Sequence, residues 1–386
     1  MKAADLIHHP YQPPAGFESP AVPVFKGSSV FAPNVAELRR TRWQDRDAYT
    51  YGLHGTPTTF ALEQRLALLE GGKHVLLAPS GLAALNLVNQ AILKSGDQLL
   101  IPDNVYGPSR SAARHELAAW GIAHAVYDPL DAESLRRQLT AATTLVWLEA
   151  AGSVTLEFPD LRGLIAVVRE TAPQALIALD NTWGAGIALR PFELGVDLTI
   201  HALTKYPSGG GDVLMGAVCC VDEALFARLA ATHGRLGLGV GGNDVELVLR
   251  NLPSLPLRYA AQDTAARRVA AFAQGLPRVR RVAHPALPGS PGHEHWRRHC
   301  SAAAGLLTLV FDEDLASERV DALIDALRVF RIAWSWGGPV SLAVPYELQA
   351  IRSRGQRGTV LRLAIGLEEP ELLMADLQQA FDRILT

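Results

Sequence analysis

From about Thr56 to Val240, short apolar runs alternate with stretches of helical periodicity, and this alternation constrains the fold of the 386-residue chain more than any other feature. The runs are rich in Val, Ile, Leu and Ala: HVLLA, QLLIP, AHAVYD, TLVWLEA, ALIALD, DLTIHAL and GAVCCV. Strands of this composition are buried on both faces, as in a mostly parallel sheet that helices cover on either side. The sequence therefore predicts an α/β fold.

The segments on either side of this alternation have a different character. The first fifty residues are rich in proline and aromatic residues and show no sustained period, which predicts an arm that lies on another surface, such as that of a partner subunit. Near residues 236–242 the sequence LGLGVGG offers a flexible connection. The remainder predicts a smaller α+β unit, with strands in LLTLVFD and TVLRLAIG and helices over about 243–275, 317–330 and 370–384. We therefore expect an N-terminal arm, a large domain and a C-terminal α+β domain, with boundaries at 1–55, 56–240 and 241–386.

Composition and charge exclude several classes of protein. Hydrophobic residues make up 48% of the chain and charged residues 19%, which excludes a disordered or fibrous protein. The 36 basic and 39 acidic side chains give a formal net charge of -3, so we expect no nucleic-acid partner. Cys219, Cys220 and Cys300 are spaced for neither a disulfide framework nor a metal site, which indicates a reducing compartment. Because the N-terminus carries charge and proline where a signal peptide needs an apolar core, we expect a cytoplasmic protein.

One uncharged stretch, residues 75–93, is long enough to cross a bilayer. It is interrupted by Pro79-Ser80-Gly81 and carries the polar residues Asn86, Asn89 and Gln90. This pattern is typical of a buried strand, a tight turn and a helix. We therefore expect no membrane partner.

Four chemically distinct features stand at the expected ends of strands, where open α/β sheets hold their ligands. Ser80-Gly81 lies between a strand and a helix start, so free backbone N–H groups could bind a phosphate, although an N-cap is the simpler interpretation of Ser80. Asp180 ends ALIALD, Lys205 precedes the loop PSGGGD, and Tyr106 follows QLLIP. Taken singly, the last three would be interpreted as a loop cap, a surface lysine and a tyrosine at the rim of the core.

Together these residues meet the needs of pyridoxal 5′-phosphate (PLP). The aldehyde of this cofactor requires a lysine amine, which Lys205 supplies, and its pyridine nitrogen requires a carboxylate, which Asp180 supplies. The phosphate requires a helix N-terminus, at Ser80-Gly81, and the ring face is satisfied by an aromatic neighbour, Tyr106. The sequence therefore predicts PLP as the cofactor.

Longer strings carry a family resemblance that extends from about Tyr51 to the C-terminus. They are YGLHGTPTTFALEQRLALLEGG, ALDNTWGAG, ALTKYPSGGGDVLMG, HPALPGSPGHEHW, WSWGG and RLAIGLEE. These strings resemble the transsulfuration (Cys/Met metabolism) family of fold-type I PLP-dependent enzymes. The string around Lys205 is the most specific, whereas DNTW and WSWGG favour the β-lyases of the family over its γ-lyases and γ-synthases. The resemblance implies a mostly parallel seven-stranded sheet in the large domain and a smaller α+β C-terminal domain.

The resemblance also implies roles for single residues toward the cofactor. Lys205 matches the lysine that bonds to the PLP aldehyde, and Asp180 matches the aspartate paired with the ring nitrogen. Tyr106 matches the tyrosine that stacks on the ring and is often assigned to proton transfer. The phosphate contacts that the resemblance and the helix start together imply are Ser80, Gly81, Leu82 and Thr204.

Further matches concern the substrate and the assembly. Arg362 matches the arginine that binds the substrate α-carboxylate, a bidentate role suited to guanidinium. Ser335 and Trp336 match the substrate-facing segment beside it. Tyr51 matches a tyrosine that reaches the cofactor phosphate of the neighbouring subunit, which implies a homo-oligomer, a tetramer built from dimers that share active sites.

Two departures from the family pattern bear on these roles. The family commonly has Tyr-Gly-Arg or Tyr-Ser-Arg where this chain has Tyr51-Gly52-Leu53, so a cation for the neighbouring phosphate is missing. The family usually has Gly-His-Ser-Asp where this chain has Gly209-Gly210-Gly211-Asp212, so two supporting side chains are missing. We expect both changes to affect cofactor affinity or substrate choice.

The expected activity is that of a PLP-dependent carbon–sulfur β-lyase. It would eliminate sulfur from Cβ of a small-molecule amino acid, converting L-cystathionine to homocysteine, pyruvate and ammonia, with Lys205 and Tyr106 as catalytic residues. The alternatives within the family are a γ-specific relative, such as a cystathionine γ-synthase or a methionine γ-lyase, and a cysteine-S-conjugate β-lyase. An alternative of another class is a catalytically inactive PLP-binding regulator.

Overall fold

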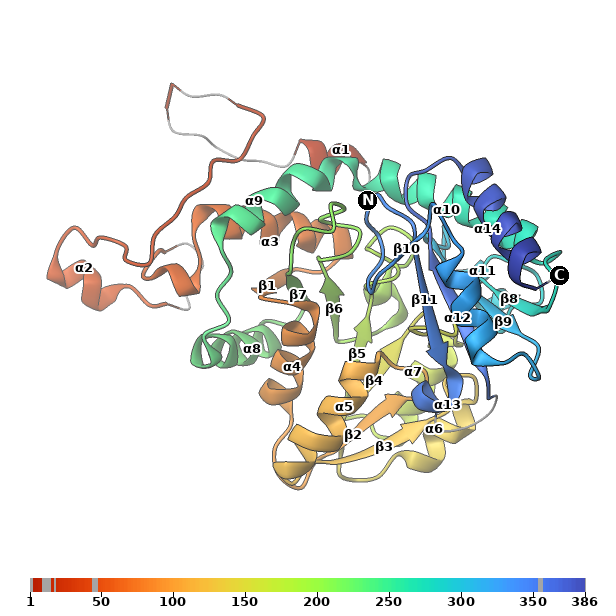
Figure 1. The fold of residues 1–386 in the computed structure, drawn as a ribbon. Helices are drawn as coiled ribbons and strands as arrows, with labels where there is room; N and C mark the ends of the chain where they lie inside the picture. Colours follow the sequence, from red (N-terminus) through yellow and green to blue (C-terminus); the bar gives the residue numbers. More distant parts are fainter. Residues whose placement is uncertain (1–2, 9–14, 17–18, 44–47, 353–356, 386) are drawn as a thin grey trace.

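The computed structural model describes residues 3–8, 15–16, 19–43, 48–352 and 357–385. Its large domain is built on a seven-stranded sheet with the order β1-β7-β6-β5-β4-β2-β3, in which only β7 runs antiparallel to its neighbours (Figure 1). The strands are β1 His74–Ala78, β2 Gln98–Pro102, β3 Ala123–Tyr127, β4 Thr143–Glu149, β5 Leu176–Asp180, β6 Leu198–Ala202 and β7 Gly216–Cys220. The mostly parallel α/β sheet expected from the sequence is confirmed.

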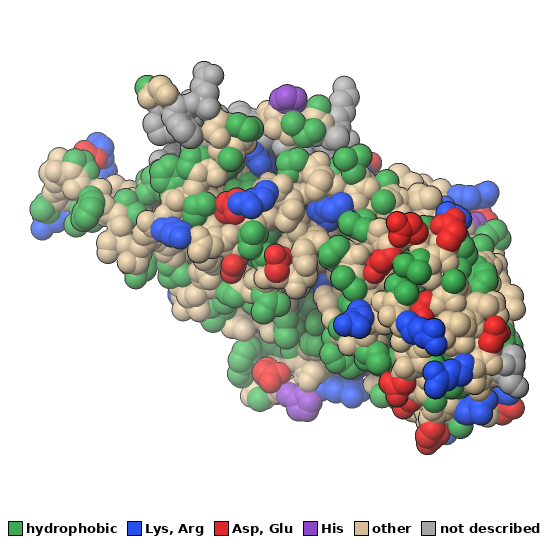
Figure 2. Space-filling model, turned by 45° about the horizontal axis from the view of Figure 1, so that its top comes forward, with side chains coloured by type: hydrophobic (Ala, Val, Ile, Leu, Met, Phe, Trp, Pro, Cys, Tyr) green, Lys and Arg blue, Asp and Glu red, His purple; other side chains and the backbone are tan. Residues whose placement is uncertain are grey.

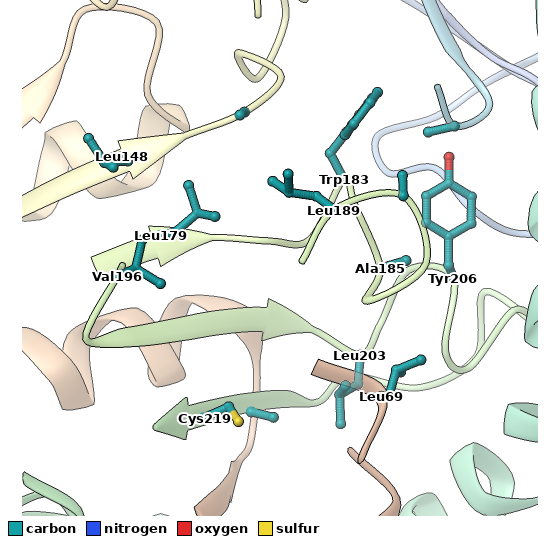
Figure 3. Packing of buried hydrophobic residues seen from close by; sticks show 14 of the residues in the cluster. Leu69, Leu148, Leu179, Trp183, Ala185, Leu189, Val196, Leu203, Tyr206 and Cys219 are labelled. Atoms are coloured by element: carbon teal, nitrogen blue, oxygen red, sulfur yellow. The ribbon is translucent and has the colours of Figure 1, made fainter. Parts of the chain in front are cut away.

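Helices cover both faces of this sheet because side chains alternate along each strand. One face packs against α4, α5 and α8 through a core that includes Leu76, Ala78 and Ile200. The other packs against α3, α6, α7 and α9, and its core includes Leu148 and Leu179, shown in Figure 3. The helices are α3 Pro57–Glu70, α4 Gly81–Ile92, α5 Gly107–Ala112, α6 Ala132–Gln138, α7 Leu161–Thr171, α8 Glu223–Leu236 and α9 Gly242–Asn251.

A second, smaller sheet has the order β10-β11-β12-β9-β8. One face packs against the helices α10, α12 and α14 through residues such as Leu361 and Leu363. The opposite face carries Arg362 and Thr308, and the Thr308 hydroxyl donates to the Val154 carbonyl of the large domain at 2.6 Å. The elements are β8 Val279–Ala283, β9 Leu306–Phe311, β10 Arg331–Ile332, β11 Leu342–Glu347, β12 Thr359–Ala364, α10 Leu255–Ala273, α11 His293–His299, α12 Ser317–Asp325, α13 Leu348–Ile351 and α14 Pro370–Ile384. This arrangement directs Arg362 toward the carboxyl ends of the large sheet.

The arm is less regular than either sheet. It holds two short helices, α1 Ala3–Ile7 and α2 Val35–Arg40, and the Asn34 side chain caps α2 by accepting from the Glu37 N–H. In Figure 1 α2 lies well away from the two sheets. The part of the expected arm at residues 1–2, 9–14, 17–18 and 44–47 lies outside the described residues.

The segment after the expected connection packs on the large domain. The residues 237–241 link α8 to α9, and Gly237 ends α8 with a φ of 67°. Val245, Val248 and Leu249 of α9 are buried in the core of the large domain. The boundary near residue 240 stays a prediction.

Within the described residues, no helix is long and apolar enough to cross a membrane. The stretch from Val75 to Leu93 forms β1, a turn and α4.

Candidate active site

A cavity of about 570 Å³ opens where the carboxyl ends of the large sheet face the small sheet. Asp180 ends β5 and Glu149 ends β4, and the two are register partners on adjacent parallel strands. Lys205 lies just beyond the end of β6, and Arg362 enters from β12. The cavity also contains all but one of the other residues that the sequence singled out: Ser80, Gly81, Leu82, Tyr106, Thr204, Ser335 and Trp336.

Lys205 lies among groups that lower its affinity for a proton. Its Nζ donates to the Ser335 Oγ at 2.7 Å and lies 5.5 Å from the Trp336 ring centroid. Burial, reinforced by the positive charge of Arg362, lowers the pKa of Lys205 to about 8. A substantial fraction of an amine with this pKa is uncharged near neutral pH and is therefore a nucleophile.

The segment that faces Lys205 has unusual backbone geometry. Ser335 has a φ of 105°, which L-residues rarely adopt. Gly337 has a φ of 77°, and a Cβ there would lie 2.9 Å from the Tyr206 backbone nitrogen, so only glycine fits. This close approach brings the Ser335 hydroxyl to Lys205 and its carbonyl to Arg362.

Two carboxylates lie side by side behind the cavity. Asp180 Oδ1 accepts from the Thr182 N–H at 2.9 Å, and Glu149 Oε2 accepts from the Tyr106 N–H at 2.8 Å. Burial, together with the neighbouring charge of Asp180, raises the pKa of Glu149 well above its usual value. Burial also raises the pKa of Asp180, whereas the hydrogen bonds of Asp180 with Thr182 lower it. Both carboxyl groups line the cavity, and Asp180 is the one that the sequence assigns to a ring N–H.

A buried polar cluster supports Asp180 from the far side of β5 and β6. Glu70, at the end of α3, accepts from the Asn181 amide at 3.0 Å and from the Thr199 hydroxyl at 3.0 Å. Its other oxygen lies 3.2 Å from the His201 Nδ1. Burial raises the pKa of Asp180; the hydrogen bonds with Thr182 and then the charge of His201 oppose this shift, whereas the charge of Glu70 adds to it.

Tyr106 precedes α5 at the cavity rim. Its backbone is fixed by Glu149, and its side chain remains 42% exposed, so one ring face is open to a ligand. Burial, followed by the charges of Asp180 and Glu149, raises the pKa of Tyr106. The phenol is therefore protonated at neutral pH.

The N-terminus of α4 forms the end of the cavity that suits an anion. Ser80 caps this helix by accepting from the Ala83 N–H at 3.0 Å. A Cβ at Gly81 would lie 2.7 Å from the Ala202 Cβ, so glycine allows the helix start to approach β6 closely. The Thr204 hydroxyl donates to the Met215 carbonyl at 3.2 Å and accepts from the Met215 N–H at 3.1 Å. Free backbone N–H groups and two hydroxyls therefore meet at this end.

Arg362 is a buried cation without an anionic partner among the described residues. It is 5% exposed, and its Nε has no hydrogen-bond acceptor. Its other nitrogens contact the Ser153 and Ser335 carbonyls, each at 3.4 Å, and the guanidinium also donates to the Tyr346 hydroxyl. Its guanidinium lies 5.1 Å from the Tyr346 ring centroid. Since a buried charge is costly unless it is paired, this site favours a carboxylate ligand.

Tyr51 is the predicted site residue that the structure places outside the cavity. It lies in the arm, 48% exposed, and its ring contacts His54 edge-on at 6.5 Å between centroids. Its predicted role toward a neighbouring subunit stays a prediction.

Glu149 and Tyr346 were missed in the sequence. Glu149 follows the apolar run of β4 as Asp180 follows that of β5, and this shared position was the available signal. Tyr346 lies in LAVPYE, where a proline and a glutamate obscure the strand, so no pattern marked it.

Arg258 contacts the altered glycine loop at Gly209, the position at which the family pattern also has glycine. A Cβ at Gly209 would lie 2.1 Å from the Arg258 Nη1, so the guanidinium occupies the place of a side chain there. Arg258 donates to the Tyr206 carbonyl at 2.8 Å and to the Asn251 carbonyl at 3.1 Å. The segment that follows Lys205 is therefore held by α10.

The residues around the cavity fit PLP in the chemistry of their donors and acceptors. Lys205 offers a nucleophilic amine, Asp180 a carboxylate for a ring N–H, and the α4 N-terminus an anion site. Arg362 remains available for a second ligand, the carboxylate of an amino acid. The cavity volume is within the range of small-molecule sites.

We expect the rate at which apoprotein attaches PLP to rise with pH and to level off above about pH 8. Only the unprotonated amine attacks the aldehyde, and the pKa of Lys205 is about 8 rather than the ordinary 10.5. Stopped-flow absorbance on mixing apoprotein with PLP at a series of pH values measures this rate. A rate that keeps rising through pH 10 would show an ordinary lysine.

Comparisons with known proteins support the same cofactor. A family model described as Cys/Met metabolism PLP-dependent enzyme matches residues 3–382. The cystathionine β-lyase of Escherichia coli (strain K12) is 35% identical over 364 residues, which are 93% of this chain and 92% of that protein. The cystathionine β-lyase of Bordetella avium is 37% identical over 390 residues, 98% of this chain and 97% of that protein. A solved cystathionine γ-synthase of Xanthomonas oryzae pv. oryzae, in complex with aminoacrylate and cysteine, has a TM-score of 0.91 at 28% identity and covers 99% of this chain and 98% of its own.

Proposed function

The chain belongs to the Cys/Met metabolism PLP-dependent enzyme family, and we propose that it is the member that cleaves the Cβ–S bond of L-cystathionine. PLP is its cofactor, and its relatives are carbon–sulfur lyases. The observation that carries the proposal is the buried, anion-free Arg362 facing the same cavity as Lys205. A carboxylate receptor beside a nucleophilic amine suits an α-amino acid substrate.

In this proposal Asp180 and the α4 N-terminus would hold the cofactor. Asp180 would accept from the ring N–H, and the Gly81 and Leu82 N–H groups with the Ser80 and Thr204 hydroxyls would bind the phosphate. The Tyr106 ring would stack on the cofactor ring. When bound, PLP supplies an aldehyde that condenses with amines and a ring that takes up the electrons left when Cα loses its proton.

The chain's own groups then bind the substrate and move its protons. Arg362 binds the α-carboxylate, displacing its weak contacts with backbone carbonyls, and Ser335 and Trp336 close the opposite side. The Lys205 amine removes the α-proton, and Lys205 or Tyr106 donates a proton to the departing sulfur. The Cβ–S bond breaks with its electron pair on sulfur, and water completes the balance: cystathionine and water give homocysteine, pyruvate and ammonia. No oxidant or reductant is needed.

Identification of the keto acid tests this proposal. Purified holoenzyme is incubated with L-cystathionine, and the products are separated by chromatography. Pyruvate with homocysteine is the expected result. Formation of 2-oxobutyrate with cysteine would show γ-elimination in place of β-elimination. Release of neither keto acid from PLP-loaded protein would indicate an inactive regulator.

The proposal extends to a homo-oligomer, a tetramer built from two dimers, in which the arm packs on a second copy. Phe31 is 98% exposed, Leu38 61% and Val35 60%. Figure 2 shows hydrophobic side chains on the projection at its left, on the side where Figure 1 has α2. Side chains this apolar are normally covered by a partner.

We expect the double variant Phe31→Asp, Leu38→Asp to dissociate into smaller species, because each change places a charge in an apolar contact. Sedimentation velocity measures the assembly. The matched control is Leu257→Asp on α10, which is 75% exposed and lies outside the arm. If the double variant sediments like the unaltered protein, the arm does not hold the assembly together.

A further inference from the structure

The outer wall of the cavity is apolar and aromatic. Trp334 is 70% exposed and packs edge-to-face on Tyr346, with 5.4 Å between ring centroids. Leu214, 71% exposed, and Ile351 line the same cavity. Because Tyr346 contacts Arg362 directly, the wall begins beside the place where the α-carboxylate would bind, and a substituent on the substrate sulfur shares the same cavity with it.

The charged side chains that line the cavity already have partners or roles. Arg352 lies between two carboxylates, with its Nε 2.9 Å from Asp103 and its Nη1 2.5 Å from Glu157. Glu149 is buried and accepts the Tyr106 N–H. Asp180, Lys205 and Arg362 serve the cofactor and the α-amino acid group in the proposed function. Among the described lining residues, none remains for a further ammonium or carboxylate.

At the position that the family resemblance assigns to the neighbouring site, the chain has Leu53 in place of the common arginine, next to the uncharged Tyr51.

The far end of L-cystathionine carries both an ammonium and a carboxylate. If the ammonium and the carboxylate lie against Trp334 and Leu214, they lose their water and gain no hydrogen-bond partner, which costs binding free energy. An apolar or aromatic group at the same place gains area burial and ring contacts. The wall therefore discriminates against charge beyond the sulfur.

We propose that the preferred substrates are L-cysteine S-conjugates whose sulfur carries an apolar or aromatic group, with Trp334 as the main specificity-determining residue. The inference rests on the proposed β-elimination and narrows its substrate class. With S-benzyl-L-cysteine, the Cβ–S bond breaks and water is consumed, giving benzyl mercaptan, pyruvate and ammonia.

A pair of unreactive analogues tests binding without turnover. Replacing sulfur by CH₂ turns S-benzyl-L-cysteine into L-2-amino-5-phenylpentanoate and L-cystathionine into L,L-2,7-diaminosuberate, and neither can undergo β-elimination of a thiol. Calorimetric titration of the holoenzyme gives their dissociation constants. We expect the phenyl analogue to bind at least about tenfold more tightly, and equal or tighter binding of diaminosuberate would overturn the inference.

Variants of Trp334 test whether the aromatic wall causes the binding preference. Trp334→Ala is expected to raise the dissociation constant of the phenyl analogue roughly three- to tenfold and to change that of diaminosuberate less than about twofold. Trp334→Phe should retain the preference for the phenyl analogue. Because Trp334 is exposed, these variants should fold. Trp120→Ala is the matched control, since Trp120 is 49% exposed and lies outside the cavity lining. Equal weakening of both analogues by Trp334→Ala would remove Trp334 from the specificity role.

Turnover separates the two proposals. The kcat/KM for pyruvate release should be higher with S-benzyl-L-cysteine than with L-cystathionine. Leu214→Glu, which adds a carboxylate at the exposed rim, should reduce the ratio of these two kcat/KM values. A preference for the phenyl analogue in calorimetry with no pyruvate from either substrate would reject β-elimination and keep the binding preference. Pyruvate from both with a higher kcat/KM for cystathionine would keep β-elimination and reject the preference.

Discussion

Replacing Lys205 by alanine should abolish covalent attachment of PLP and lower the rate of pyruvate release by about a thousandfold or more. Loss of a single positioned acid–base group costs about a hundred- to ten-thousandfold, and Lys205 is proposed both to bond to the cofactor and to move the α-proton. Borohydride reduction followed by mass spectrometry of the intact chain measures attachment. The keto acid assay measures turnover.

The control for this variant is Lys94→Ala, which removes an exposed lysine at the end of α4. It should attach PLP and release pyruvate like the unaltered protein. If Lys205→Ala still carried reducible PLP, another lysine would hold the cofactor and the site assignment would be wrong.

Replacing Arg362 by alanine should lower kcat/KM by roughly thirtyfold to several thousandfold. Removing one partner of a buried, hydrogen-bonded charge pair costs about 2–5 kcal/mol, and the substrate carboxylate would be that partner. Arg362→Lys should restore part of the loss, because a lysine keeps the charge but not the two-pronged geometry. Steady-state kinetics with both variants measures the effect. An unchanged KM and kcat in Arg362→Ala would exclude carboxylate binding at this residue.

Substitutions that remove the charge of Arg362 should alter two properties of the apoprotein. Because the charge of Arg362 lowers the pKa of Lys205, its removal should move the pH dependence of PLP attachment to higher pH. Because Arg362 is buried without an anion, Arg362→Met should also raise the thermal unfolding midpoint of the apoprotein. A lower midpoint would mean that the guanidinium stabilises the fold rather than serving a ligand.

The core of the large sheet could be predicted from sequence because its strands are continuous apolar runs. The strands of the small sheet were harder to predict. The sequence of β8 is VRRVA and that of β11 is LAVPYE, so charged residues and a proline interrupt any apolar run. Both strands pair with a strongly apolar neighbour, β9 or β12, which compensates for their weak patterns.

The helix expected over 317–330 was too long, and the reason is tertiary. It ends at Asp325, after which the backbone N–H groups of Arg328, Val329 and Phe330 donate to the Asp376 carboxylate of α14 at 2.8, 2.8 and 3.1 Å. A distant carboxylate that replaces the helical acceptors leaves no trace in the local periodicity.

Most candidate site residues could be brought together from sequence because parallel strands end at one edge. Asp180, Lys205 and Tyr106 follow that rule, and Arg362 came from the family resemblance alone, since no local pattern places β12 opposite the large sheet. The aromatic wall of Trp334 and Tyr346 could not be predicted either, because no local pattern places these residues at the cavity.

The order of these residues along the chain has a consequence for protein synthesis. Asp180 and Lys205 belong to the large sheet, whose strands all precede residue 221, whereas Arg362 belongs to β12. A growing chain folds its earlier segments first, so the ribosome releases the aldehyde-binding lysine well before the guanidinium that receives an amino acid. The residues proposed to hold the cofactor are therefore all synthesised before the residue proposed to hold the substrate carboxylate.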